Sequence, residues 1–232
     1  MKCNYLIVIV FYFCLSSSFA QGEKNYWFFG NNAGLDFSSG TATAISGNLN
    51  TFEGCASIAS SAGDLLFYTD GITVYDPSGS PMTNGGGLLG NPSSTSSAII
   101  VPLPQSTTQY IIFSVDFVNG TNGINYSIVD MDDNGNGVYD PGVDFGQIPA
   151  GLKNINLPGP TGERICAVKH SNGQDYWVTA TEKNTNTFYT YQITPCGVNT
   201  TPQIQSVGPT MSAGYYMKHS PSGGKIARTD GT

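Results

Sequence analysis

Short apolar runs separated by polar turns follow one another along most of the chain. From residue 21 onward no apolar pattern keeps a helical period for more than about one turn, and the runs are rich in Val, Ile, Tyr, Phe and Thr. Runs of this kind, bounded by Gly, Asn, Asp and Ser, are typical of β-strands. The pattern predicts strands over residues 26–29, 55–60, 65–69, 72–75, 98–103, 110–115, 124–129, 152–157, 165–169, 176–180, 188–193 and 215–218. We therefore expect an all-β protein.

The predicted strands recur as copies of one unit. CASIASSAGDLLFYT (55–69) aligns with CAVKHSNGQDYWVT (166–179), which aligns with YMKHSPSGGKIART (216–229), and AIIVPLPQSTTQYIIFS (98–114) is a looser copy. Each copy consists of a strand, a polar turn and a strand, and the copies follow at intervals of roughly 45 to 65 residues. A repeat of about 40 to 50 residues with four short strands is the signature of a β-propeller blade. A β-sandwich would lack this self-similarity and is the second choice.

The repeats divide the chain into a leader and one propeller domain. Residues 21–232 form a partial propeller of about three and a half blades, because the fourth repeat breaks off after its second strand. The blades lie near residues 53–97, 98–160, 164–210 and 213–232. A propeller needs roughly four or more complete blades and a contact between the first and the last. We therefore expect the first part of a longer protein or a truncated copy, which alone is poorly soluble or oligomeric.

The first 20 residues have the pattern of a signal peptide. Lys2 is followed by an apolar stretch over 5–15, and Ser18 and Ala20 are the small residues before a cleavage site. The apolar stretch is shorter than the roughly 20 residues that span a bilayer. The sequence therefore predicts an exported protein that begins at Gln21 and has no membrane span.

The charge of the chain excludes two classes of partner. The formal net charge is −7, from 9 basic and 16 acidic side chains, and no cluster of Lys or Arg offsets it. Such a surface repels phosphate groups. Nucleic acids and anionic membranes are therefore not expected partners.

Cysteine and histidine give no sign of a metal site. The mature chain keeps Cys55, Cys166 and Cys196, an odd number without zinc-type spacing, and their disulfide state stays open. His170 and His219 both lie in Lys-His-Ser at the same place in successive repeats. This repetition indicates a structural task, such as bonding a neighbouring turn.

One acidic stretch, DMDDNGNGVYDPGVD at 130–144, resembles a calcium-binding loop. Counted from Asp132, it matches the first nine positions of the D-x-[DN]-x-[DN]-G loop, but Val143 stands where the twelfth position requires Glu. Asp144 follows one place later. The predicted Ca²⁺ ligands are Asp132, Asn134, Asn136, the Val138 carbonyl, Asp140 and Asp144. The alternative is a solvated acidic turn. In either case the stretch is an insertion between the third and fourth strands of the second blade.

No nucleophile motif of a hydrolase is present. The sequence contains no GxSxG and no HExxH. Pairs of carboxylates for glycoside chemistry could come from Glu53, Asp70, Asp116 and Glu163, which lie near strand ends, but any acidic protein offers such pairs.

Several strings together resemble one protein family. They are YWFFGNNAGLDFSSG, NTFEGCASI, GDLLFYTDGITVYD, GLLGNPSSTSSAIIVP, AVKHSNGQDYWV and AGYYMKHSPSGGKIA. In this order they resemble the amino-terminal propeller region of secreted Bacteroidetes surface proteins of the type IX secretion, gliding-motility-associated group. The resemblance covers nearly all of the mature chain and implies export and a role at the cell surface, with no activity attached to named residues. Unlike those proteins, this sequence has no sorting domain and carries the acidic insertion.

Together these features predict a cell-surface or extracellular binding or structural module with a Ca²⁺-stabilised loop. It would be the amino-terminal part of an adhesin-like protein, and its partner would be an extracellular protein or polysaccharide. The alternative is a propeller-type hydrolase or lyase that acts on glycans or peptides.

Overall fold

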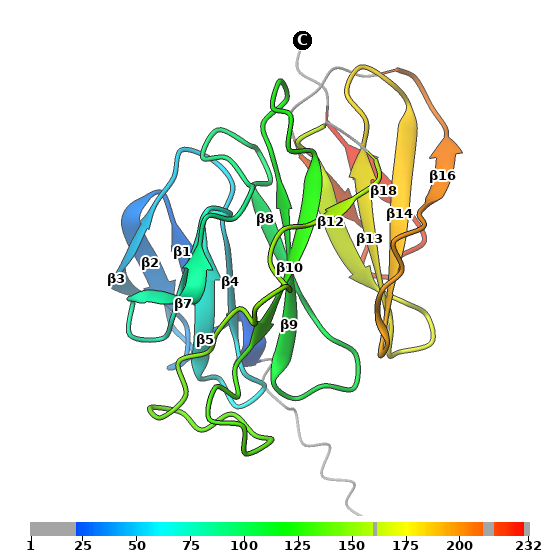
Figure 1. Cartoon of the computed structure of the whole chain (residues 1–232). Coiled ribbons are helices and arrows are strands. Elements are labelled where there is room, and N and C mark those ends of the chain that lie inside the picture. The colour runs from blue at the N-terminus through cyan, green and yellow to red at the C-terminus, as the bar shows by residue number, and fades with distance from the viewer. Residues whose placement is uncertain (1–21, 160–161, 211–215, 230–232) are drawn as a thin grey trace, which may run out of the picture.

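The described part of the computed structural model, residues 22–159, 162–210 and 216–229, is all-β. Its one helical element is a 3₁₀ turn at Gly22–Lys24. The described residues contain no helix that is long and apolar enough to cross a membrane. The predicted signal peptide lies outside the described residues. The strands form five antiparallel sheets, which stand side by side like the leaves of a fan (Figure 1).

Each sheet is built from strands that follow one another in sequence. The first contains β1 (Tyr26–Phe29), β2 (Asn31–Asp36) and β3 (Thr43–Asn50). The second contains β4 (Ala56–Ala59), β5 (Leu65–Thr69), β6 (Thr73–Tyr75) and β7 (Pro81–Gly86). The third contains β8 (Ala98–Pro102), β9 (Gln109–Val115), β10 (Ile124–Asp130) and β11 (Ile155–Leu157). The fourth contains β12 (Ile165–Lys169), β13 (Tyr176–Thr181), β14 (Thr187–Thr194), β15 (Gly197–Val198) and β16 (Gln203–Ser206). The fifth contains β17 (Met217–His219) and β18 (Ile226–Arg228).

The second to fifth sheets coincide with the four sequence repeats. Every run predicted as a strand overlaps an observed strand, and β10 and β11 are the third and fourth strands of their sheet, as predicted. The strands without a predicted counterpart include β2, β3, β7 and β16. These strands are rich in Asn, Gly, Ser and Gln and are mostly exposed, so they lack the apolar alternation on which the prediction relied.

The sheets pack face to face, and the middle sheets are buried on both sides. Successive residues of a strand point to opposite faces, and β9 shows the consequence. Ile112 lies in the core shared with the second sheet, whereas Ile111 and Phe113 lie in the core shared with the fourth. All three side chains are fully buried. A third core, around Phe28, Leu49 and Tyr68, joins the first sheet to the second.

Hydrogen bonds also cross from each sheet to the next. Ser57 Oγ donates to the Tyr26 carbonyl at 2.6 Å, and Ser97 Oγ donates to the Asp70 carbonyl at 2.6 Å. The second contact requires glycine at the next position. Gly71 has a φ of +86°, and a Cβ there would lie 2.1 Å from Ser97 Oγ. The fourth and fifth sheets are tied by the buried Arg164, whose Nη2 donates to the Thr229 carbonyl at 3.1 Å.

As a result, the first strands of successive sheets become neighbours. β1 lies against β4, β4 against β8, β8 against β12, and β12 against β17. No closed propeller is detected among the described sheets, which form an open fan. The fan brings four strands that are far apart in sequence, β4, β8, β12 and β17, to one place.

Burial of both sheet faces leads to a test with two phenylalanines. Replacing the fully buried Phe67 with Ala should lower the free energy of unfolding by about 3–5 kcal/mol, because it removes a ring from the core between the second and third sheets. Phe52 is 92% exposed, so Phe52→Ala should change the free energy of unfolding by less than about 0.5 kcal/mol. Urea denaturation measures both values. Equal losses of unfolding free energy in the two variants would contradict the packing of the second sheet against the third.

Candidate functional site

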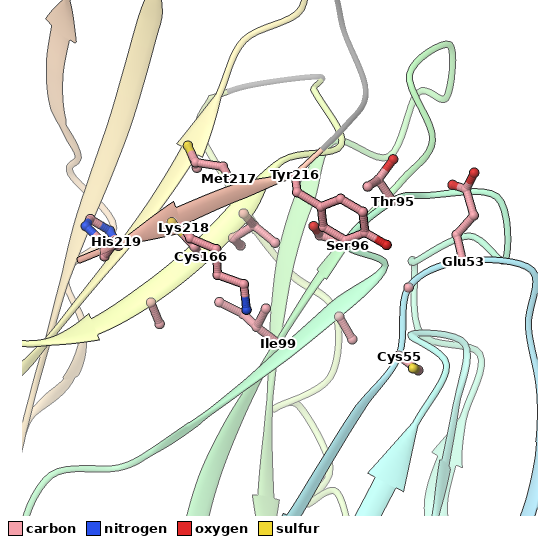
Figure 2. Close-up of a pocket in the computed structure, with 14 residues that line it drawn as sticks. Glu53, Cys55, Thr95, Ser96, Ile99, Cys166, Tyr216, Met217, Lys218 and His219 are labelled. Carbon is pink, nitrogen blue, oxygen red and sulfur yellow. The ribbon is translucent and has the colours of Figure 1, made fainter. Parts of the chain in front are cut away.

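A pocket with mixed polar and apolar walls lies where the first strands of four sheets meet. It has a volume of about 410 Å³ and is lined from the chain before β4, from the chain before β8, and from β8, β12 and β17 (Figure 2). The walls include the small residues Gly54, Ala98 and Ala167.

Five polar side chains that line the pocket have no hydrogen-bond partner among the described residues: those of Glu53, Ser96, Tyr216, Lys218 and His219. Within the described residues, no hydrogen bond or ion pair engages the Glu53 carboxylate, the Lys218 ammonium group or the Tyr216 hydroxyl. The Tyr216 side chain is 62% exposed and points toward Thr95 and Ser96, whose hydroxyls also line the pocket (Figure 2). The pocket thus presents one carboxylate, one ammonium group, the His219 imidazole and the hydroxyls of Ser96 and Tyr216 to a ligand, whereas the Thr95 hydroxyl donates to Glu163.

The two pocket thiols are poor nucleophiles. Cys166 is buried, and this burial raises the pKa of its thiol to about 12. Burial, and to a smaller extent the charge of Asp70, raises the pKa of Cys55 above its usual value. Because the thiolate is the reactive form, both side chains behave as small apolar residues at neutral pH. All three cysteines of the described chain, including the exposed Cys196, are free thiols.

The two histidines differ, although their sequence contexts match. His170 Nδ1 accepts a hydrogen bond from the Asn172 N–H at 2.9 Å, so this imidazole bonds a turn as predicted. Neither ring nitrogen of His219 has a partner among the described residues, and burial lowers the pKa of this histidine. His219 therefore does not perform the same task as His170.

Two of the four carboxylates predicted near strand ends, Asp70 and Asp116, stabilise turns. Asp70 Oδ1 accepts the N–H groups of Ile72 and Thr73, and Asp116 accepts those of Phe117 and Asn122. These bonds hold the turns in the position that places the strand ends around the pocket. They also occupy the carboxylates, so neither is free for general acid or base catalysis.

Glu163 joins the third sheet to the fourth. It is buried, and Oε2 accepts the N–H and the hydroxyl of Thr95, whereas Oε1 accepts the N–H of Val118 at 2.7 Å. Of the four predicted carboxylates, Glu53 alone lines the pocket.

The acidic insertion is a compact loop bonded within itself. Asp132 accepts the N–H groups of Asn136 and Gly137 at 2.9 and 2.6 Å. Asn134 Nδ2 donates to Asp144 Oδ1, and Asn136 Nδ2 donates to Asp140 Oδ2, each at 2.7 Å. Within the predicted ligand set, hydrogen bonds thus join Asn134 to Asp144, and Asn136 to Asp132 and Asp140, but they do not gather all five side chains around one point.

Asp144 is the centre of this loop. It is 1% exposed, and the hydrogen bond from the Asp140 N–H lowers the pKa of its carboxyl group below the usual value. Partial burial and the neighbouring Asp144 carboxyl raise the pKa of Asp133. The loop therefore holds at least one buried negative charge.

The second half of the insertion binds the neighbouring sheet. Ile148 N–H donates to the Thr83 carbonyl at 3.0 Å, and Asn84 Nδ2 donates back to the Ile148 carbonyl at 2.8 Å. Lys153 Nζ donates to Asn84 Oδ1 at 2.7 Å, and Asn154 Nδ2 donates to the Gly87 carbonyl at 2.8 Å. We call residues 147–154 the latch. It ties the third sheet to the outer strand of the second, a role that the sequence analysis did not predict.

The donor set of the loop fits a hard cation, although its carboxylates alone do not converge. Carboxylate, amide and carbonyl oxygens are the ligands that Ca²⁺ prefers. Within the described residues, no three His, Cys, Asp or Glu side chains lie close enough together to hold a metal ion. A shared ion would therefore need the oxygens of Asn134 and Asn136 and the Val138 carbonyl as well.

Comparisons of the chain with protein-family models, with curated proteins and with solved structures found no match. The site is therefore interpreted from its own geometry.

The burial of the thiols gives an order of reactivity. In native protein beginning at Gln21 at pH 8, iodoacetamide should modify the exposed Cys196 first, Cys55 more slowly and Cys166 last, because burial keeps the last two protonated. Mass spectrometry of timed peptide digests measures each rate. In urea all three should react alike, and labelling of native Cys166 as fast as Cys196 would show that the pocket thiol is activated.

Proposed function

We propose that this chain is an exported binding module of the β-propeller type, in which each sheet is a blade and its first strand faces the axis. One observation carries the proposal: β4, β8, β12 and β17 meet around a pocket whose charged groups have no partner among the described residues. Ligand sites are concave and carry a few polar groups that fix the ligand. The sequence repeat and the resemblance to secreted Bacteroidetes surface proteins point to the same class.

The chemistry of the pocket favours binding over hydrolysis. A glycoside hydrolase needs two carboxyl groups across the scissile bond, and Glu53 is the one carboxylate that lines the pocket. A thiol hydrolase needs a thiolate, and the pKa of Cys166 is about 12. The hydrolase or lyase alternative therefore has less support than a binding module.

Calcium binding by the acidic loop is the second part of the proposal. The ligands would be Asp132, Asn134, Asn136, the Val138 carbonyl, Asp140 and Asp144. In the ion-free loop the amides of Asn134 and Asn136 donate to carboxylates. Rotation of these amides would turn their oxygens toward the same carboxylates, an arrangement that is repulsive unless a cation lies between them. Bound calcium would thus stiffen the loop that leads into the latch.

Calcium should stabilise the protein through this loop. Millimolar Ca²⁺ should raise Tm by a few degrees, because an ion at about 100 times its Kd adds about 2.7 kcal/mol to the stability of the folded state. Asp132→Ala should abolish the shift, since it removes the first ligand. Asp133→Asn, in the same loop but outside the ligand set, should keep it. Calorimetric titration without heat at millimolar Ca²⁺ would refute the site.

One experiment tests export and binding together. The full sequence, expressed in a bacterial host, should be recovered outside the cytoplasm with Gln21 as its first residue. This protein is then applied to immobilised polysaccharides and extracellular proteins. Saturable binding that Lys218→Glu weakens at least tenfold supports the module, because the variant reverses a charge in the pocket. Retention of Met1 in the cytoplasm argues against export, and release of cleavage products supports the hydrolytic alternative.

A further inference from the structure

We infer that the pocket between β4, β8, β12 and β17 binds a neutral sugar unit of an extracellular polysaccharide. The inference rests on the proposed binding function and names the ligand class of the same site. It follows from three properties of the pocket: its charge balance, its mixture of hydrogen-bond donors and acceptors, and its exposed aromatic ring.

The charge balance favours a ligand without net charge. Glu53 and Lys218 have opposite charges, and neither has a side-chain partner in the described part of the chain. An anionic ligand would meet Glu53 and the overall charge of −7, and a cationic ligand would meet Lys218. A wholly apolar ligand would remove water from the Glu53 carboxylate and the Lys218 ammonium group without giving either a hydrogen bond in return. A neutral, strongly polar ligand avoids each of these costs.

The mixture of donors and acceptors matches a polyol. The Lys218 ammonium group only donates hydrogen bonds, the Glu53 carboxylate only accepts them, and the hydroxyls of Ser96 and Tyr216 do both. The Thr95 hydroxyl already donates to Glu163, so it can only accept from a ligand. The ring nitrogens of His219, which have no partner among the described residues, add one donor or acceptor each. Every sugar hydroxyl can donate and accept, so one ring can satisfy both kinds of group at once. A peptide side chain brings either a charge or an apolar group, or one amide, and satisfies fewer of them.

The ring of Tyr216 provides a flat apolar surface beside these groups. Its side chain is 62% exposed, and Figure 2 shows the ring at the side of the pocket that also carries Thr95 and Ser96. The C–H face of a pyranose can pack on such a ring while its hydroxyls bond the rim. The volume of about 410 Å³ lies within the range of small-ligand pockets.

The test is affinity electrophoresis of the protein that begins at Gln21, through gels containing dextran, mannan, xylan or mixed-linkage glucan. Gels with alginate, an anionic polysaccharide, and with gelatin, a polypeptide, run beside them. At least one neutral polysaccharide should retard the protein. Tyr216→Ala should weaken that retardation about tenfold, because the stacking surface is lost, and Glu53→Gln should weaken it severalfold.

Phe145→Ala is the matched control, since this aromatic residue is 39% exposed but lies in the acidic insertion, outside the pocket. It should leave retardation unchanged, and Tyr216→Phe, which keeps the ring, should lose less than Tyr216→Ala. Thermal melts confirm that each variant is folded. Retardation by alginate alone would show an anionic sugar ligand, and retardation by gelatin alone would show a polypeptide ligand. Either result would overturn the assignment of a neutral sugar but leave the binding module standing. Equal retardation of wild type, Tyr216→Ala and Glu53→Gln would place sugar binding elsewhere, and no retardation in any gel would count against both proposals.

Discussion

The structure depends on burying both faces of each middle sheet. One neighbouring sheet cannot bury both Ile111 and Ile112 of β9, because the two side chains point in opposite directions. A sheet must therefore stand on each side. Repetition of this requirement along the chain gives a row of sheets and brings their first strands together. The pocket results from this packing, because its walls come from segments that lie far apart in the sequence.

Polar contacts set how closely neighbouring sheets approach. The hydrophobic effect is non-directional and does not by itself fix register, whereas a buried hydrogen bond has a defined length and angle. The contacts of Ser57, Ser97, Glu163 and Arg164 supply one such constraint at each junction between sheets. Removal of one partner would leave a buried polar group unsatisfied. The acidic and basic residues near strand ends are therefore better explained by assembly of the sheets than by catalysis.

The sequence was sufficient for the parts of the fold that depend on local patterns. Short apolar runs bounded by turn residues located β4, β5, β9 and β13, and the self-similar repeat located the second to fifth sheets. The exposed strands β2, β3 and β16 could not be found in this way, because their ladders rest on backbone hydrogen bonds that any sequence can make.

The same limit applies to the candidate site. The nine-position motif placed the acidic loop between β10 and β11, where it lies. Lys153 bonds Asn84, which lies more than about 65 positions earlier in the sequence. Glu53 lines the same pocket as Tyr216 and Lys218, which are still farther away along the chain. No local pattern marks such pairs, and only the packed sheets bring them together.

The latch has a consequence for how this chain can change in length. The acidic loop that precedes the latch has open space at Gly135 and Gly142, where a Cβ would meet no atom within 4 Å. An epitope or spacer inserted at either glycine should therefore leave the sheets intact. Shortening the connection to a tight turn would delete Ile148 and Lys153, and with them the bonds that join the outer edges of two sheets. Insertions at these glycines are therefore tolerated more readily than deletion of the whole segment.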